Sequence, residues 1–247
     1  MSGHSKWNNI KHKKEKTDKL RAKVFTKIGK EIAMAVRDGG PDPVSNGKLK
    51  DLIAKAKANN VPNDNIERTI KKASGADGDV NYEVICYEGY GPSGVAVIVE
   101  TTTDNRNRTG ADMRHYFDKY GGNMGQTGCV SYMFEDKGVI EIEGEDIDEE
   151  KIMEDALEAG AEDISGEDGA YTVTTAPNDL DAVMHALTDK GYRFTSCENS
   201  KIPSNYVTLT NEDDIKNMTK LLDMFDDNDD VTGVWHNWEN EGDGEED

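Results

Sequence analysis

The chain lacks the features by which several protein classes are recognised. Its 247 residues include only three cysteines, Cys86, Cys129 and Cys197, and these lie far apart. Their spacing offers neither a disulfide framework nor a Cys-x-x-Cys metal site, so we expect reduced, structural thiols. No apolar run is longer than Val95–Val99, which is too short to span a membrane. The first twenty residues hold no apolar core, which argues against a secretory signal and predicts a cytoplasmic protein.

Motifs for catalysis and metal binding are also missing. The five histidines show no His-Glu-x-x-His or other ligand spacing, and no Gly-x-Ser-x-Gly or Walker motif occurs. The glycines of GYGPSG are not followed by Gly-Lys-Ser/Thr, so this segment predicts a hairpin loop. The acidic run at 226–230 resembles the start of a calcium loop, but Val231 stands where that loop needs glycine. We therefore expect no enzyme activity, no cofactor and no metal.

Charge is abundant, and it is unevenly distributed along the chain. The formal net charge is −21, yet residues 1–75 carry 18 basic against 8 acidic residues, which leaves 11 basic against 42 acidic residues in the remainder. The first segment therefore has a net charge of +10 and the second −31. This asymmetry predicts a basic module that faces a polyanion and an acidic remainder that limits nonspecific binding. A basic tail that only aids solubility is the alternative.

Residues 1–16 have no apolar periodicity, but they carry side chains suited to binding nucleic acid. Lysines can neutralise phosphates, and the flat rings of tryptophan and histidine can stack on unpaired bases. The candidate contacts in this tail are His4, Lys6, Trp7, Lys11, His12, Lys13, Lys14 and Lys16. For Trp7 the alternative is that the indole folds back onto the helices that follow.

Three amphipathic helices are predicted after this tail. Apolar residues recur at helical spacing over 17–37 and stop at the Gly-Gly-Pro of 39–41, and shorter helices are expected around 49–56 and 66–73. A second stripe on the first helix lies beside its apolar stripe, and we expect it to face solvent and to contact nucleic acid. This stripe consists of Lys19, Lys23, Lys27 and Lys30.

From Tyr82 onward the pattern alternates between strands and helices. YEVICYEGY and VAVIVETTT predict two strands, which are followed by a helix and by a strand from Cys129 to Phe134. Arg106 and Arg108 lie at the start of that helix, where cations oppose the helix dipole, so a bound anion such as phosphate is expected there. Ion pairs with the acidic body are an equally weighted alternative.

A second α+β unit follows, and several long motifs then resemble one known family. MSGHSKWNNIKHKKEKTDKLRAKVFTKIGKEI, GGPDPVSNGKL, NVPNDNIERTIKKASG, YEGYGPSGVAVIVETTTDNRNRT and GGNMGQTGCVSYMF are similar to the YebC/PmpR family from end to end. The resemblance implies an α+β fold of three domains. The first is an N-terminal three-helix bundle, and the second and third are ferredoxin-like α+β domains, of which the third is inserted in the second. It implies a basic helical domain at 1–76, α+β domains at 77–134 with 206–239 and at 135–205, and an acidic tail at 240–247.

The resemblance also implies a role in gene expression. Members are named as DNA-binding transcriptional regulators, or act in translation, where bacterial members associate with ribosomes stalled on proline-rich sequences. The sequence has no clear recognition helix, zipper or two-fold device, whereas a tail rich in lysine, histidine and tryptophan suits structured RNA. We therefore favour a monomeric translation factor that binds RNA or the ribosome and has no membrane partner. A DNA-binding transcriptional regulator is the alternative, and a protein-binding adaptor is a third hypothesis.

If the ribosome is the target, the glycine-rich segment Gly121–Gly128 is a candidate functional loop. Its glycines would let the backbone approach RNA or a peptidyl end closely, and Met124 and Gln126 are its largest side chains. The candidate residues are Gly121, Gly122, Asn123, Met124, Gly125 and Gln126. The alternative is a connecting loop whose glycines only satisfy a positive φ.

Overall fold

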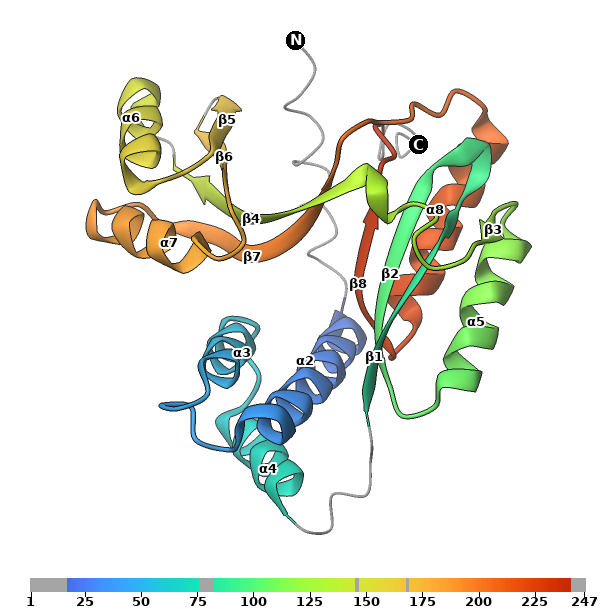
Figure 1. The fold of residues 1–247 in the computed structure, drawn as a ribbon, viewed down its shortest axis with the longest axis horizontal. Helices are drawn as coiled ribbons and strands as arrows, with labels where there is room; N and C mark the ends of the chain where they lie inside the picture. Colours follow the sequence, from blue (N-terminus) through green and yellow to red (C-terminus); the bar gives the residue numbers. More distant parts are fainter. Residues whose placement is uncertain (1–16, 76–81, 145–146, 168, 241–247) are drawn as a thin grey trace.

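The computed structural model describes residues 17–75, 82–144, 147–167 and 169–240 (Figure 1). In this part of the chain the N-terminal helices lie below the second sheet and beside the lower end of the first, and each sheet carries two helices (Figure 1). None of the helices described is long and apolar enough to cross a membrane.

Three helices form the N-terminal domain: α2 (Thr17–Gly39), α3 (Gly47–Ala58) and α4 (Asn63–Ser74). The apolar residues that recur at helical spacing in the sequence meet in one core, which confirms the three predicted helices. The core includes Ile28, Ile32, Ala35, Leu49, Ala56 and Ile66. The turn before α3 is fixed by Asn46, whose side chain caps the helix by accepting the N–H of Leu49 and donates to the carbonyls of Ala35 and Gly40.

The first sheet is antiparallel and combines segments that are distant in the sequence. Its strands are β1 (Glu83–Tyr90), β2 (Ala96–Thr103), β3 (Asn123–Met124) and β8 (Val231–His236), in the order β3-β1-β2-β8. The 3₁₀ turn η2 (Pro92–Gly94) joins β1 to β2. Helices α5 (Arg106–Lys119) and α8 (Glu212–Asp227) pack on one face, where Val97 and Val99 of β2 meet Phe117 and Phe225. The other face of β2 is covered by the segment that follows β3, through Val130.

The second sheet is built from one continuous stretch of chain. Its strands are β4 (Phe134–Glu143), β5 (Asp163–Glu167), β6 (Ala170–Thr175) and β7 (Phe194–Pro203), in the order β5-β6-β4-β7. Helices α6 (Glu149–Ala159) and α7 (Leu180–Asp189) supply the other half of its core. The chain order strand-helix-strand-strand-helix-strand is that of a ferredoxin-like unit.

The predicted α+β fold, a helical N-terminal region followed by sheet domains, is confirmed. The second sheet lies between β3 and β8 of the first sheet in the sequence, and on this basis we propose domain boundaries near residues 76, 134 and 205. The ferredoxin-like strand connectivity holds in the second sheet. In the first sheet the two hairpin strands β1 and β2 occupy the centre, so the connectivity there is different.

The predicted strand from Cys129 to Phe134 is wrong. Residues Ser131–Met133 form a 3₁₀ turn, η3, and the strand β4 begins only at Phe134. The physical reason is a buried carboxylate, that of Glu88, which accepts the backbone N–H groups of Val130 and Ser131. These donors are therefore not available to a strand partner.

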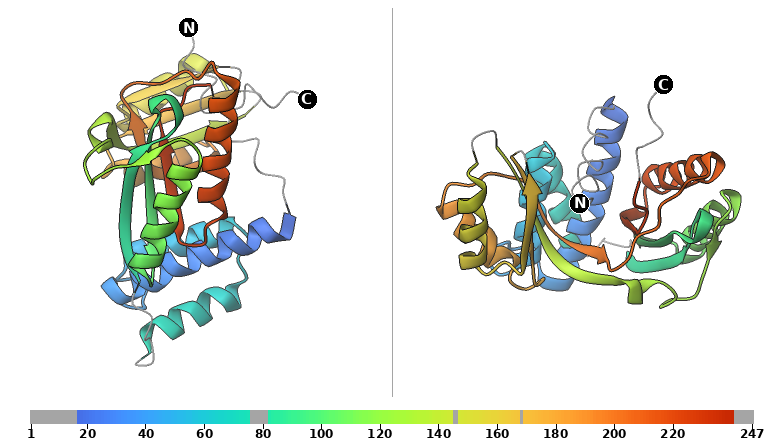
Figure 2. Two further views of the ribbon diagram at one scale, coloured as in Figure 1. Left: turned by 90° about the vertical axis from the view of Figure 1, so that its right-hand side faces the viewer. Right: turned by 90° about the horizontal axis from the view of Figure 1, so that it is seen from above.

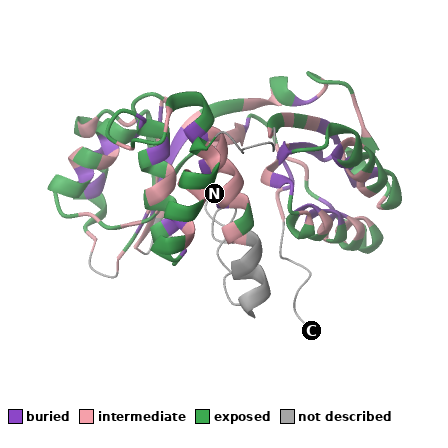
Figure 3. Ribbon diagram, turned by 90° about the horizontal axis from the view of Figure 1, so that it is seen from below, coloured by how far each residue is buried: buried purple, intermediate pink, exposed green. Residues whose placement is uncertain are grey.

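Polar contacts join the three domains. The indole N–H of Trp235 in β8 donates to the hydroxyl of Ser200 in β7 at 3.1 Å, which connects the two sheets. Helix α2 crosses one end of the first sheet (Figure 2). Seen from below, buried residues concentrate where helices face their sheet, while the outer faces of the helices are exposed (Figure 3).

Candidate nucleic-acid interface

Most of the candidate contacts in the basic tail lie outside the described residues. These are His4, Lys6, Trp7, Lys11, His12, Lys13, Lys14 and Lys16. Lys19 and Lys23 fall within helix α2, but their side chains are also outside the described part. The role of these ten residues stays a prediction.

The stripe on α2 does not face solvent along its whole length. The Lys30 ammonium donates to the carbonyl of Asp229 at 3.0 Å and to Oδ1 of Asp230 at 2.5 Å, and its side chain is only 13% exposed. Lys27 lies one turn earlier and reaches the carbonyl of Asp226 at 3.4 Å. The expectation that the stripe faces solvent is therefore wrong for Lys30. The stripe runs beside the buried face of α2, and the acidic turn before β8 packs against that edge.

Asp230 is the centre of this contact. Its carboxylate accepts from Lys30, from Arg108 Nη2 at 2.7 Å, from Thr109 Oγ1 at 2.8 Å and from Thr103 Oγ1 at 3.2 Å. Burial by itself would raise the pKa of Asp230, but the hydrogen bonds from Lys30, Arg108 and Thr109 outweigh it and lower the pKa to about 2. The carboxylate is thus charged at neutral pH and ties α2 to the start of α5.

The two arginines at the start of α5 have different surroundings. Arg108 is held by Asp230 and by Asp104 at 3.0 Å, as the alternative of ion pairs with the acidic body expects. The Arg106 side chain is 69% exposed and lies 3.7 Å from Glu83, a loose surface pair. Arg106 is the more exposed of the two and the more loosely paired, so it is the better candidate for a phosphate contact.

The glycines of the candidate loop are explained by the protein's own structure: Gly121 and Gly128 have a positive φ, as the alternative of a connecting loop expects, and Gly122 and Gly125 are closely packed. A Cβ on Gly122 would lie 2.5 Å from the carbonyl oxygen of Tyr90, and one on Gly125 would lie 2.5 Å from the sulfur of Cys129. Met124 packs against the core beneath α5, whereas Gln126 is exposed. Of the two large side chains predicted to make contacts, only Gln126 is therefore well placed to do so.

A buried carboxylate organises the segment that follows this loop. Glu88 is 4% exposed and accepts the N–H groups of Gly128, Val130 and Ser131 at 2.8 to 2.9 Å. Burial tends to raise its pKa, but the three backbone hydrogen bonds lower it below the ordinary value. The backbone carbonyl of Glu88 also accepts the N–H of Gly125 at 2.8 Å. Both ends of the loop are thus tied to β1.

The basic residues of α3 and α4 were not predicted from the sequence as individual candidates. All of them are exposed: Lys48, Lys50, Lys55, Lys57, Arg68, Lys71 and Lys72. The signal that could have found them was the net charge of the first 75 residues, to which they contribute. Lys55 lies 3.5 Å from Glu31, while Lys50 and Lys57 are two turns apart on the side of α3 away from that pair.

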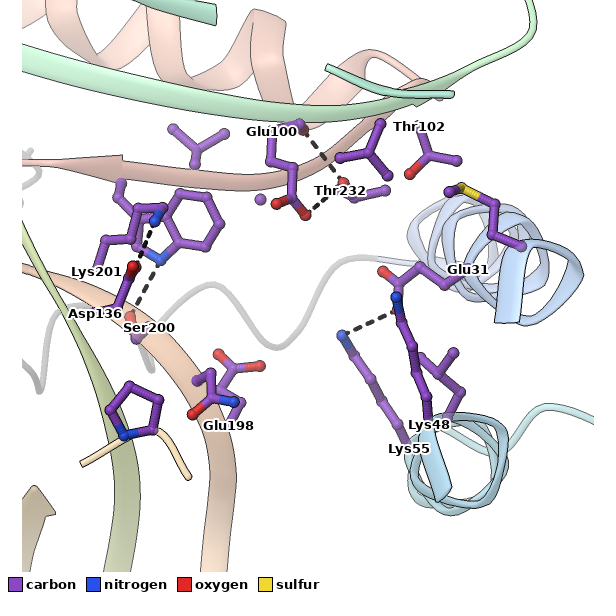
Figure 4. A pocket seen from close by; sticks show the side chains of 18 residues that line it. Glu31, Lys48, Lys55, Glu100, Thr102, Asp136, Glu198, Ser200, Lys201 and Thr232 are labelled. Atoms are coloured by element: carbon purple, nitrogen blue, oxygen red, sulfur yellow. Dashed lines mark hydrogen bonds and ion pairs between the residues drawn. The ribbon is translucent and has the colours of Figure 1, made fainter. Parts of the chain in front are cut away.

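A cavity of about 680 Å³ lies where the three domains meet (Figure 4). Glu31 of α2, Glu100 of β2 and Glu198 of β7 reach it from the three domains, together with Lys48, Lys55 and Lys201. Burial raises the pKa of Glu31. The nearby Lys55 ammonium lowers it and the carboxylates of Glu100 and Glu198 raise it further, so that the pKa stays above its ordinary value. No group of three or more potential ligands able to hold a metal occurs among the described residues. The cavity has mixed charge, and we assign it no ligand.

Comparisons with known proteins agree with this architecture. Residues 5–76 match the model of the TACO1/YebC protein N-terminal domain, and residues 82–238 match that of the TACO1/YebC second and third domain. The chain belongs to the TACO1/YebC family. The predicted family is therefore confirmed, and the boundary between the two matches falls in the segment between α4 and β1.

Bacterial relatives match over the full length. One from Ruminiclostridium cellulolyticum is 58% identical over all of both chains, and one from Agathobacter rectalis is 57% identical over 97% of this chain and 100% of its own. Each is named "Probable transcriptional regulatory protein". A crystal structure of a conserved hypothetical protein from Aquifex aeolicus is 42% identical, covers 91% of this chain and 92% of its own, and has a TM-score of 0.81.

Proposed function

We propose that this protein is a non-enzymatic regulator of gene expression that binds nucleic acid through its N-terminal domain. The observation that carries the proposal is the charge distribution, +10 in residues 1–75 and −31 in the rest. An acidic body of this size repels a polyanion, so most phosphates of a bound nucleic acid are expected to lie against the basic domain. The names of the bacterial relatives support a regulatory role.

The described residues narrow the phosphate-binding surface. Lys30 and Arg108 are both engaged by Asp230, so we assign Lys30 to the contact between domains and Arg108 to the support of Asp230 in that contact. Lys55 pairs with Glu31, whereas Lys50 and Lys57 are exposed on the other side of α3 and can neutralise phosphates. The tail residues and Arg106 extend this surface in our proposal.

The finer proposal is an RNA-binding translation factor that associates with the ribosome and helps synthesis through proline-rich stalls. Support for RNA comes from the tail, because splayed bases and phosphates can be met together by rings and lysines. The proline-rich substrate rests on the family resemblance alone. The alternative is a DNA-binding transcriptional regulator, which the names of the relatives favour.

A sucrose gradient of a lysate that contains the tagged protein tests the choice of partner. We expect migration with ribosomes that is lost at moderate salt and after RNase but not after DNase. Retention on genomic DNA that DNase abolishes would favour the transcriptional regulator. Binding that survives both nucleases would instead favour a protein-binding adaptor.

The salt dependence of RNA affinity tests the surface. Replacing Lys50 and Lys57 with Gln is expected to flatten the slope of log Kd against log salt by about 1.4 to 1.8, since each phosphate contact contributes roughly 0.7 to 0.9. The matched control replaces Lys216 and Lys220, two exposed lysines of α8 on the acidic body, with Gln. An equal change in both variants would contradict the assignment to α3.

A further inference from the structure

Tyr132 is the one exposed aromatic ring, counting Phe, Trp and Tyr, among the residues that the structure describes. Its relative exposure is 71%, and the other eight tyrosines are all partly or fully buried. Single exposed apolar residues are common on proteins, so exposure by itself indicates little. The surroundings of Tyr132 are what distinguish it.

The backbone on both sides of Tyr132 is held in place. Ser131 donates its N–H to Oε2 of Glu88 at 2.8 Å, and the carbonyl of Met133 accepts the N–H of Ser204 at 2.8 Å. The Tyr90 hydroxyl donates to the carbonyl of Cys129 at 3.1 Å, which holds the residues just before Tyr132 against β1. The ring is therefore presented from a fixed scaffold, which reduces the entropy lost when a ligand stacks on it.

The segment around Tyr132 is also uncharged. Charged residues make up 32% of the chain, yet none occurs from Tyr120 to Phe134. Asn123, Gln126 and Thr127 are exposed there and can donate and accept hydrogen bonds. A segment that offers an accessible aromatic ring and neutral amides but no charged side chain does not suit a phosphate. It suits an uncharged planar group with hydrogen-bonding edges, which is the chemistry of an unpaired nucleobase.

We propose that Tyr132 stacks on an unpaired base of the bound RNA and that Gln126 contacts the edge of that base. The inference rests on the proposed function, because the lysines of the N-terminal domain must hold the phosphates of the same RNA. It adds a second contact with the RNA, on a different domain from the lysines. It also gives the loop after β3 a role in binding, which the glycines of this loop do not by themselves indicate. Glu88 holds the backbone between these two side chains through the N–H groups of Gly128, Val130 and Ser131.

The test uses the full chain and single-stranded RNA of mixed sequence, with affinity measured at several salt concentrations. Tyr132→Ala is expected to weaken binding by about 5- to 150-fold, as for loss of one stacked base, without a change in salt slope. Tyr132→Phe keeps the ring and is expected to stay within about twofold of the wild type. Leu157→Ala removes a comparably exposed side chain from α6 and is the matched control for both.

Crosslinking gives a second measurement that does not depend on a substitution. RNA containing 4-thiouridine is expected to crosslink to the peptide that contains Tyr132. In a third measurement, Gln126→Ala is expected to change the binding preference among the four RNA homopolymers. Wild-type affinity in Tyr132→Ala, with the lysine variants still flattening the slope, would overturn this inference and leave the proposed function standing. Absence of RNA binding by the wild type would overturn both. Loss of an RNase-resistant protein partner in Tyr132→Ala, with unchanged RNA affinity, would make the loop a protein-docking surface instead.

Discussion

Replacing Asp230 with Asn tests the contact that docks the helical domain on the first sheet. The Asp230 side chain is 7% exposed, and its pKa of about 2 lies below the reference value of 3.8. A difference of this size corresponds to about 2 kcal/mol of stability at neutral pH, and breaking a buried ion pair costs up to roughly 3 to 5 kcal/mol. We therefore expect Asp230→Asn to lower the free energy of unfolding by about 2 to 4 kcal/mol.

Two further variants test whether the stability lost in Asp230→Asn comes from the buried ion pairs of this carboxylate. Asp230→Asn leaves the cations of Lys30 and Arg108 facing each other without an anion between them. Lys30→Met leaves Asp230 with three other donors, so its cost should be smaller, about 1 to 2 kcal/mol. The matched control is Asp229→Asn, because that neighbouring carboxylate is exposed, and its loss should stay within about 0.5 kcal/mol.

Urea unfolding followed by circular dichroism and tryptophan fluorescence measures these differences, since Trp235 and Trp238 lie in and just after β8. Because the folded pKa of Asp230 is lowered, its contribution is present above about pH 4 and is lost as the pH falls toward 2. The difference between wild type and Asp230→Asn should therefore shrink over that interval. Equal costs for Asp229→Asn and Asp230→Asn, or a difference that does not change with pH, would refute the reasoning.

Two further substitutions test the glycine-rich loop and its support. Glu88→Gln keeps the shape but removes the charge that accepts three N–H groups, so we expect a loss of about 1 to 3 kcal/mol and faster amide exchange at Gly128, visible by NMR. Gly122→Ala places a Cβ 2.5 Å from a backbone oxygen and should cost about 1 to 3 kcal/mol. Gly29→Ala on α2, where nothing lies within 4 Å, should instead stabilise by about 0.5 to 1 kcal/mol. A thermal melt in which the two alanine variants shift alike would contradict the packing argument.

The helices and strands could be predicted from the sequence because the patterns that indicate them are local. The helix expected over 17–37 is observed as Thr17–Gly39, since apolar spacing and the Gly-Gly-Pro stop both act within a few residues. The strand expected over 129–134 failed because its N–H groups are taken by Glu88, some 40 residues earlier in the chain. Nothing in the local pattern marks Glu88 as the acceptor.

The residues of the candidate site were harder to predict from the sequence, for a related reason. Lys30 and Lys50 look alike in the sequence, each a lysine on a basic amphipathic helix. Lys30 meets Asp230, 200 residues later, only after α8 and β8 have completed the first sheet. Net charge along the chain therefore predicts that a basic domain exists, but the partner of each cation depends on tertiary contacts.

The glycines of the loop at 121–128 do not by themselves indicate a ligand. Gly122 and Gly125 are required by contacts within the protein, so their presence is not an argument for close approach of a ligand. Whatever the loop recognises must then be met by side chains that the packing leaves outside, and these are uncharged. Under the proposed RNA binding, most of the cations are on a different domain from this loop, so affinity and selectivity would be set by separate surfaces. The contact between Lys30 and Asp230, which holds one domain against the other, would under that proposal determine which RNA shapes can reach both.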